Sequence, residues 1–413
     1  DDSVVRVMEG APRLLRRARG YAPSQIQLPP GFASADDLLA LGGELKNTLC
    51  LLKDGQAILS QHLGDLENEA TFRDFTKTLD LYRRLYDHQP SLLVGDLHPN
   101  YRTTRFGREL AQEMGVAWRQ VQHHHAHITS VMAENRRPLD AGPVLGIALD
   151  GSGYGADGTI WGGEFLLADY LGFERLGLFR PAPLPGGARA ILQPWRNSFA
   201  QLHTQFGWEA ILASWGTLEP IRWLNRQPVD MLTGMIEHKL NSPLSSSCGR
   251  LFDALAVLLG ICREGISYEG QAAIELEAML SENAPVDQSG YQFELVPSEL
   301  GLMLDPIPCW QAVLSDLAQG VAREAIAARF HRGLADAVAE MAVRLAGRHG
   351  LTSVALSGGV FQNRTLFERV VENLRASGLN PLTHQLVPAN DGGLSLGQAV
   401  IAAARRIRGA DSC

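Results

Sequence analysis

The chain has 413 residues, of which 45% are hydrophobic and 20% are charged. This composition is typical of globular proteins that bury sizeable cores, and it excludes a disordered or collagen-like chain. The formal net charge of -8 argues against a protein whose main partner is a nucleic acid. No apolar run reaches the ~20 residues of a membrane span, and the first residues lack the pattern of a secretion signal, so we expect a cytoplasmic protein without a membrane partner.

The first segment, residues 1–28, is basic, whereas the remainder of the chain is acidic. Such a local pattern predicts a linker or an element that belongs to a preceding domain, and a solvated arm is the alternative. The chain also opens without an initiator methionine, so we expect a fragment of a longer protein. The arginines of this segment are Arg13, Arg16, Arg17 and Arg19, and Pro23, Pro29 and Pro30 close it.

Residues 29–140 have the pattern of one α/β lobe. Short apolar stretches separated by polar turns predict a three-stranded meander, and apolar residues at helical spacing then alternate with further strands. The predicted elements are strands at 38–43, 48–52 and 57–62, a helix over 69–86, a strand over 92–94, a helix near 105–114 and a strand near 117–122.

Residues 141–413 repeat this order and predict a second lobe. A long middle region, about 189–345, has apolar residues at helical spacing and is interpreted as a helical insertion. The duplication favours two α/β lobes with a ligand in the cleft between them, at the carboxyl ends of the strands. The predicted elements outside the insertion are strands at 144–149 and 159–167, a strand over 354–356, a helix over 364–376, a strand near 382–387 and a helix over 394–407.

The strongest local signal is a histidine cluster, because four of the 12 histidines fall within five positions after an apolar strand. If this segment starts a helix, His123 and His127 lie one turn apart on one face and can reach one metal ion, while His124 and His125 point elsewhere. A helix start with solvated or hydrogen-bonded imidazoles is the alternative. A metal would need a further ligand, for which a carboxylate is the natural choice.

Two aspartates are candidates for that ligand. Asp150 ends a strand and opens a glycine-rich turn over 150–155, where a carboxylate could hold the metal that accompanies a phosphate. An ordinary β-hairpin would use the same glycines. Asp391 precedes two glycines between the last predicted strand and the last helix, so it would reach the same cleft, although a helix N-cap has the same pattern.

Glycines at strand ends and helix starts mark where a nucleotide would lie. The alternatives are an ordinary βα loop for the glycines at 358–359, a surface charge for Lys46 and a surface helix residue for Arg196. Arg196 could bind an anionic group with two parallel hydrogen bonds and is a candidate catalytic residue. The nucleotide candidates are Gly151, Ser152, Gly153 and Tyr154, then Gly358, Gly359 and Asn363, then Gly43 and Lys46 at the first hairpin, and Asp253, Gly270 and Glu275 in the middle region. The carboxylates of Asp253 and Glu275 could bind ribose hydroxyls.

Taken together, HHHAH at 123–127, DGSGYG at 150–155, LSGGVFQN at 356–363 and NDGG at 390–393 resemble the carboxyl-terminal part of the HypF-type hydrogenase maturation carbamoyltransferases. The resemblance covers about residues 30–407 and implies a duplicated fold of the actin/hexokinase/Hsp70 type. Residues 2–6 and 16–23 resemble the last segment of the YrdC-like domain that precedes it. The resemblance therefore implies that residues 1–28 are the tail of that domain and that the other amino-terminal domains are missing.

The resemblance also implies a reaction. Carbamoyl phosphate and ATP give a carbamoyl-adenylate in the YrdC-like domain, and the region seen here transfers the carbamoyl group to the carboxyl-terminal cysteine of HypE, toward the cyanide ligand of the NiFe centre. It implies a divalent metal, iron or zinc, with magnesium accompanying the nucleotide. The implied metal ligands are His123, His127, Asp150 and Asp391, and the implied nucleotide contacts include Gly358, Gly359, Asn363, Asp253 and Gly270. With Arg196 added from its own sequence pattern, the catalytic candidates are His123, His127, Asp150 and Arg196.

Two other functions are compatible with the same pattern. One is an ATP-dependent phosphotransferase of the same fold, although such enzymes hold magnesium with carboxylates and water rather than with imidazoles. The other is a non-catalytic nucleotide-binding assembly factor. The arginine-rich segment suggests one further hypothesis, that Arg13 to Arg19 lie at the interface with the missing domain and guide its anionic intermediate.

Overall fold

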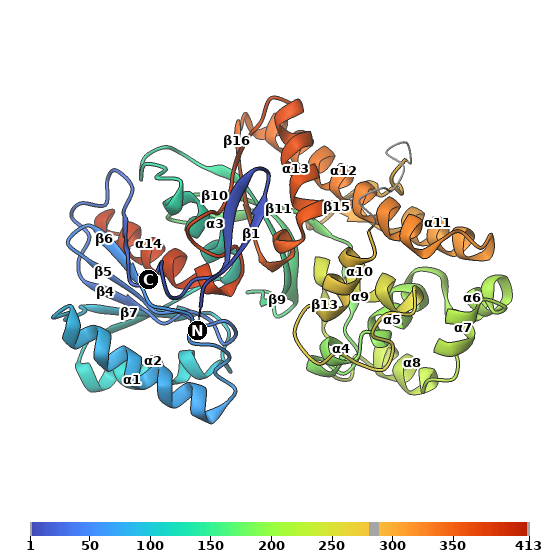
Figure 1. The fold of residues 1–413 in the computed structure, drawn as a ribbon, viewed down its shortest axis with the longest axis horizontal. Helices are drawn as coiled ribbons and strands as arrows, with labels where there is room; N and C mark the ends of the chain where they lie inside the picture. The colour runs from blue at the N-terminus through green and yellow to red at the C-terminus, as the bar shows by residue number, and fades with distance from the viewer. Residues whose placement is uncertain (1, 281–288, 411–413) are drawn as a thin grey trace.

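The computed structural model describes residues 2–280 and 289–410. Its first lobe contains a six-stranded sheet in the order β3-β6-β5-β4-β7-β8 (Figure 1). The strands β4, β5 and β6 form the predicted antiparallel meander, and β4, β7 and β8 are parallel. All the elements predicted for this lobe occur. They are β4 (Leu38–Ala40), β5 (Cys50–Lys53), β6 (Gln56–Leu59), α1 (Glu69–Leu85), β7 (Leu92–Asp96), α2 (Arg102–Met114) and β8 (Ala117–Val121), with β3 (Gln25–Gln27) added at the edge.

The second lobe repeats this plan in a nine-stranded sheet. The strands β9, β10 and β11 form an antiparallel meander, and β9, β16 and β17 are parallel, as β4, β7 and β8 are in the first lobe. The two-lobed, duplicated α/β fold is therefore confirmed. The strands are β9 (Val144–Tyr154), β10 (Ile160–Ala168), β11 (Phe173–Phe179), β16 (Ser353–Ser357) and β17 (Asn380–Leu382), and the helices that follow the last two are α13 (Arg364–Ala376) and α14 (Leu394–Ile407).

Two local predictions in this lobe were wrong. The glycine-rich segment 150–155 continues β9 rather than forming a turn, because its glycines leave room for packed imidazoles: a Cβ at Gly153 would lie 2.4 Å from Cε1 of His124. The strand expected near 382–387 ends at Leu382, and the residues after it form a loop. The strand β11 was not predicted individually.

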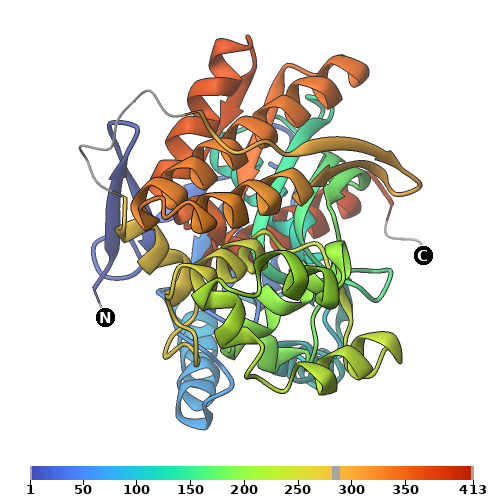
Figure 2. The same cartoon turned by 90° about the vertical axis from the view of Figure 1, so that its right-hand side faces the viewer.

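The insertion is mainly helical, as expected, but residues 294–305 form a hairpin. Its strands β14 (Glu294–Ser298) and β15 (Gly301–Asp305) extend the second sheet, with β15 parallel to β11. The short strands β12 (Ala182–Pro183) and β13 (Leu244–Ser245) pair with each other, and β13 also pairs with the start of β10. The helices lie on the right in Figure 1 and face the viewer in Figure 2. They are α4 (Ala188–Leu192), α5 (Trp195–Phe206), α6 (Trp208–Trp215), α7 (Glu219–Leu224), α8 (Val229–Glu237), α9 (Cys248–Leu258), α10 (Gln271–Ala278), α11 (Ile307–Ala318) and α12 (Arg323–His349).

Two helices cross between the sheets and join the lobes. The helix α3 (His123–Glu134) follows the first sheet but packs on β9, β10 and β16, whereas α14 follows the second sheet but packs on β4, β5 and β7. They meet so closely that a Cβ at Gly397 would lie 1.8 Å from the carbonyl oxygen of Ala126. One continuous apolar cluster therefore contains residues of both lobes.

The amino-terminal segment is a hairpin of β1 (Val4–Met8) and β2 (Ala11–Arg16) that lies against both lobes. Arg13 and Arg17 are each only 3% exposed. The guanidinium of Arg13 donates to the carbonyls of Met8 and His384, and that of Arg17 donates to the carbonyl of Leu59. The alternative of a solvated arm is therefore wrong for these two arginines. Both guanidinium groups are already hydrogen-bonded to backbone carbonyls of this chain. Arg13 and Arg17 therefore hold the hairpin in place and are not free to guide an anionic intermediate.

Within the described ranges, no helix has the length and apolar character needed to cross a membrane.

Candidate metal centre

The carboxyl ends of parallel strands from both sheets converge on one place, as the duplication predicted. From the first lobe, β8 leads into α3, whose N-cap Gln122 accepts a hydrogen bond from the backbone N–H of His125 at 2.8 Å. This start fixes the predicted helix and places His123 and His127 on its inner face. From the second lobe, β9 delivers Asp150, and the loop before α14 delivers Asp391.

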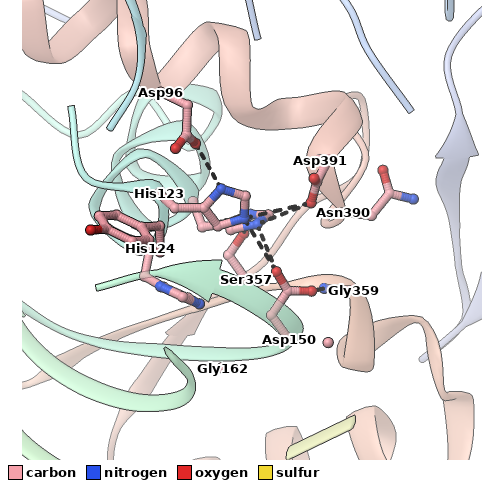
Figure 3. Close-up of polar contacts among 12 residues, drawn as sticks. Asp96, His123, His124, Asp150, Gly162, Ser357, Gly359, Asn390 and Asp391 are labelled. Carbon is pink, nitrogen blue, oxygen red and sulfur yellow. Dashed lines mark hydrogen bonds and ion pairs between the residues drawn. The ribbon is translucent and has the colours of Figure 1, made fainter. Parts of the chain in front are cut away.

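Four side chains meet at this point, and Figure 3 shows the imidazole of His123 between the carboxylates of Asp150 and Asp391. Their ligand atoms all lie within 4.8 Å of one another. The Nε2 atoms of His123 and His127 are each 3.4 Å from Oδ2 of Asp150, and they are 3.7 and 3.6 Å from Oδ1 of Asp391. The structure therefore brings together all four residues that were predicted as metal ligands.

These residues fit a divalent transition metal. Two imidazole nitrogens and two carboxylates are a common donor set for such ions. Two atoms that each lie about 2.1 Å from a tetrahedrally coordinated ion are about 3.4 Å apart, which matches the observed separations. In addition, Nε2 of His127 is buried without a hydrogen-bond partner among the described residues, and a metal would satisfy this atom.

The charges of the site favour a cation. Burial lowers the pKa of His123, but the carboxylates of Asp96, Asp391 and Asp150 outweigh this effect and raise the pKa well above its ordinary value. Burial raises the pKa of Asp150, but His123 and His127 hold it well below its ordinary value. The group therefore attracts positive charge, which a proton or a metal cation can supply.

Asp96 is a functional residue that the sequence reasoning missed. It is fully buried at the end of β7, and its Oδ2 lies 2.8 Å from Nδ1 of His123. A carboxylate can only accept, so Nδ1 of His123 carries a proton, and in the neutral ring Nε2 has the lone pair that a metal would use. Its sequence signal was an aspartate two residues after the predicted strand 92–94, whereas Asp150 directly follows the predicted strand 144–149.

The other two histidines of the cluster point elsewhere, as predicted for a helix. Nε2 of His125 lies 2.7 Å from the carbonyl oxygen of Asp169, and burial lowers the pKa of His125 to about 4. The ring of His124 packs near Trp161, and burial lowers its pKa well below the ordinary value. Both imidazoles are therefore neutral packing groups.

Several predicted nucleotide residues surround the four ligands. The backbone N–H of Gly359 donates to Oδ1 of Asp150 at 3.0 Å. Gly358 has a φ of 104°, and a Cβ there would lie 2.2 Å from the carbonyl oxygen of Leu149, so only glycine fits. A Cβ at Gly43 would lie 3.4 Å from Oδ2 of Asp391. These glycines let backbone and ligands approach the carboxylates closely.

Lys46 also reaches this cleft, where its ammonium group pairs with Glu269 of the insertion. Burial lowers the pKa of Lys46, but the carboxylates of Glu269, Asp391 and Asp150 raise it above its ordinary value. Ser152, Gly153 and Tyr154 line a neighbouring cleft of about 540 Å³ together with first-lobe residues that include His98 and Tyr101.

The remaining nucleotide candidates make their hydrogen bonds and ion pairs with residues other than the four metal ligands. The side chain of Asn363 caps α13 and donates to His331, and Gly270 precedes α10 with a φ of 76°. Glu275 on α10 accepts a hydrogen bond from Gln271. Asp253 lies between Asn197 and Arg250, at 3.2 and 3.0 Å.

Arg196 is not brought to the metal ligands. It is 5% exposed, and its guanidinium donates to the side chain of Gln193 at 2.7 Å and to the carbonyl of Pro185 at 3.4 Å. The glycine turn at 186–187 folds against this guanidinium and explains its position. No hydrogen bond or ion pair in the described part of the chain joins it to the four ligands, so a direct catalytic contact finds no support.

Comparison with known families agrees with this architecture. A model described as the HypF Kae1-like domain matches residues 33–134, and one described as the carbamoyltransferase Kae1-like domain, second subdomain, matches residues 146–398. The two lobes thus define a Kae1-like domain. The chain belongs to the HypF carbamoyltransferase family.

Individual relatives support the same assignment. Carbamoyltransferase HypF of Rhodobacter capsulatus is 44% identical over 405 residues, which cover 98% of this chain and 51% of the relative. A carbamoyltransferase HypF homolog of Cupriavidus necator is 37% identical over 388 residues, covering 91% of this chain and 93% of the homolog. This chain spans about half the length of the Rhodobacter protein.

A crystal structure of full-length HypF in the phosphate- and nucleotide-bound form superposes with a TM-score of 0.88 at 37% identity, covering 98% of this chain and 61% of that one. The expected fold, a duplicated actin/hexokinase/Hsp70-type fold with helical insertions, is confirmed.

Proposed function

We propose that this chain is a carbamoyl-transferring domain in the maturation of NiFe hydrogenases. Its donor is carbamoyl-adenylate, made from carbamoyl phosphate and ATP by a YrdC-like domain that precedes it, and its acceptor is the carboxyl-terminal cysteine of HypE. Membership of the HypF carbamoyltransferase family supports the reaction class. The observation that carries the proposal is the four-ligand group at the cleft between the lobes, flanked by glycines that allow a phosphate to approach.

His123, His127, Asp150 and Asp391 would hold the metal, which would supply positive charge to the phosphate and the acyl carbonyl. The backbone around Gly358 and Gly359 lies against Asp150, where it offers close access to a nucleotide phosphate. The start of α9 supports this placement, because Ser247 donates to the carbonyl of Gly151 at 2.6 Å and the positive end of the helix lies at the same segment. The related crystal structure of full-length HypF is described as phosphate- and nucleotide-bound, which supports nucleotide binding in this family.

The acceptor comes from outside the chain in this proposal. Cys50 and Cys248 are fully buried, and burial raises the pKa of both thiols, so neither is a reactive thiolate. The external thiol gives up its proton to solvent and its sulfur bonds to the carbamoyl carbon. The bond from that carbon to the phosphate oxygen breaks, and AMP leaves with the electron pair of that bond. The cleft lined by Gly153 would receive the acceptor, and it borders the metal ligands because Gly153 packs so closely on His123 that a Cβ there would lie 2.8 Å from the ring.

The test combines metal content with transfer. Wild type and the double variant His123→Ala/His127→Ala are analysed for metal and for transfer of labelled carbamoyl from carbamoyl-adenylate to a peptide that ends in the HypE cysteine. We expect about one metal ion per chain, lost together with transfer in the variant.

His88→Gln is the matched control, because His88 is buried and bonds to the carbonyl of Leu52 before β7, at the opposite end of that strand from Asp96. It should retain both metal and transfer. A metal-free wild type that transfers carbamoyl would remove the metal from the proposal.

A further inference from the structure

The inward nitrogen of His127 begins a buried chain of polar side chains. Nδ1 of His127 lies 3.3 Å from Oγ of Ser357, and that Oγ lies 3.0 Å from Nε2 of His384. Nδ1 of His384 lies 2.8 Å from Oε2 of Glu134. Ser357 is fully buried and the side chains of His384 and Glu134 are 4% and 6% exposed, so water does not compete for these contacts.

Three separate elements build this chain. His127 and Glu134 are seven residues apart on α3, about two helical turns, and so share one face. Ser357 ends β16 beside the imidazoles in Figure 3, and His384 comes from the loop after β17. The last member is itself fixed, because Oε1 of Glu134 accepts from the backbone N–H groups of Gln385 and Leu386, both at 2.6 Å.

The hydrogen bonds that link these side chains all run in one direction, from His127 toward Glu134 or the reverse, and Glu134 decides which. A carboxylate only accepts hydrogen bonds, so Nδ1 of His384 carries a proton and, in the neutral ring, Nε2 accepts. The hydroxyl of Ser357 then donates to His384, which is closer than its other acceptor, the carbonyl of Ala389 at 3.4 Å. The hydroxyl oxygen is left to accept from Nδ1–H of His127. In the neutral ring of His127, Nε2 consequently has the lone pair, on the side of Asp150 and Asp391.

We propose that Glu134, His384 and Ser357 are positioning residues of the metal centre, which hold His127 in the tautomer that binds metal through Nε2. His123 receives the same orientation directly from Asp96, whereas His127 receives it through two intermediates from a carboxylate two turns away. This inference rests on the proposed metal site and adds the residues that orient it. The amino-terminal hairpin helps to hold His384 in place, since Arg13 donates to its backbone carbonyl.

Glu134→Gln is the most informative variant, because it keeps the size of the side chain and reverses the direction of the chain. The amide oxygen can still accept from Gln385 and Leu386, which turns the NH₂ group toward His384. Nε2 of His384 then donates to Ser357, Ser357 donates to His127, and the proton of His127 moves to Nε2, where it blocks the metal. Ser357→Ala instead interrupts the chain by removing one hydroxyl group.

The experiment measures the Zn²⁺ dissociation constant by competition with a chelator. In the metal-free protein, at a pH high enough for His127 to be neutral, it also measures the tautomer of His127 by ¹⁵N shifts of its ring. We expect Zn²⁺ binding to weaken about 10- to 100-fold in Glu134→Gln and in Ser357→Ala. The His127 proton should move from Nδ1 to Nε2 in Glu134→Gln. His88→Gln should match wild type in both measurements, and circular dichroism should show that each variant is folded.

Wild-type affinity and an unchanged His127 tautomer in Ser357→Ala would overturn the proposal, even if Glu134→Gln did not fold. A wild type that binds neither Zn²⁺ nor Co²⁺ would overturn the metal centre as well. Zn²⁺ binding that depends on His123 but not on Ser357 would leave the metal centre intact and overturn only this inference.

Discussion

Single residues show that the two metal-ligating imidazoles are oriented by different means. His123 contacts the Asp96 carboxylate directly, and His127 contacts the hydroxyl of Ser357. The sequence predicted the ligands themselves, because histidines at i and i+4 and aspartates after strands are local patterns. It could not predict Ser357 or His384 as partners of His127, because their contact depends on how distant strands are placed.

Asp253 gives a pH prediction. Burial raises its pKa to about 6, although Arg250 and Asn197 lower it, so ionisation is less favourable in the folded chain than in the unfolded chain. Its contribution to stability is complete below about pH 4 and is lost as the pH rises through about 6. We therefore expect the neutral variant Asp253→Asn to gain stability relative to wild type between about pH 5 and about pH 7.5.

Thermal unfolding of both proteins at the two pH values measures this effect. The difference in melting temperature, variant minus wild type, should become more positive at the higher pH. A difference that is independent of pH would show that Asp253 titrates at its ordinary value.

At the scale of elements, the crossing of α3 and α14 depends on one glycine. A Cβ at Gly397 would lie 1.8 Å from the carbonyl oxygen of Ala126, so Gly397→Ala must push the helices apart. We expect a destabilisation of about 1–3 kcal/mol, as for other overpacked cores. Chemical denaturation of the variant measures it.

Gly347→Ala is the matched control, because Gly347 lies in α12 with nothing within 4 Å of an added Cβ. Helix propensity there predicts stabilisation of about 0.5–1 kcal/mol. Equal effects of the two substitutions would contradict the close helix contact.

The elements differ in how well local pattern predicted them. Helices and strands with a clear period, such as α1 and β7, were predicted within a few residues. The hairpin 294–305 was missed because it interrupts a region rich in helical spacing, and its strands are stabilised by pairing with β11, far away in sequence. The packing of α14 on the first sheet has no local signal at all.

At the scale of the whole molecule, Lys46 and Glu269 link the first lobe to the insertion across the cleft. Their side chains are 29% and 45% exposed, so the pair itself contributes only about 0–1 kcal/mol to stability. Glu269→Gln should therefore leave the melting temperature nearly unchanged. Lys46→Met should weaken nucleotide binding several-fold, because it removes positive charge beside the proposed phosphate site.

Calorimetric titration of ATP into the two variants and wild type separates these roles. Loss of affinity in Lys46→Met with wild-type melting behaviour is the expected result. Unchanged affinity in Lys46→Met would make this lysine only a contact between the lobes.

The crossed helices also constrain how the protein is made. The inner face of the first sheet, with Leu38, Ala40 and Leu52, is covered by Val400 and Ile401 of α14. A ribosome synthesises the first sheet long before that helix, so the nascent first lobe presents an uncovered apolar surface while the second lobe is still being translated. Such surfaces are where aggregation begins. Within this chain, the helix that covers the first sheet is therefore synthesised after the strands of both sheets.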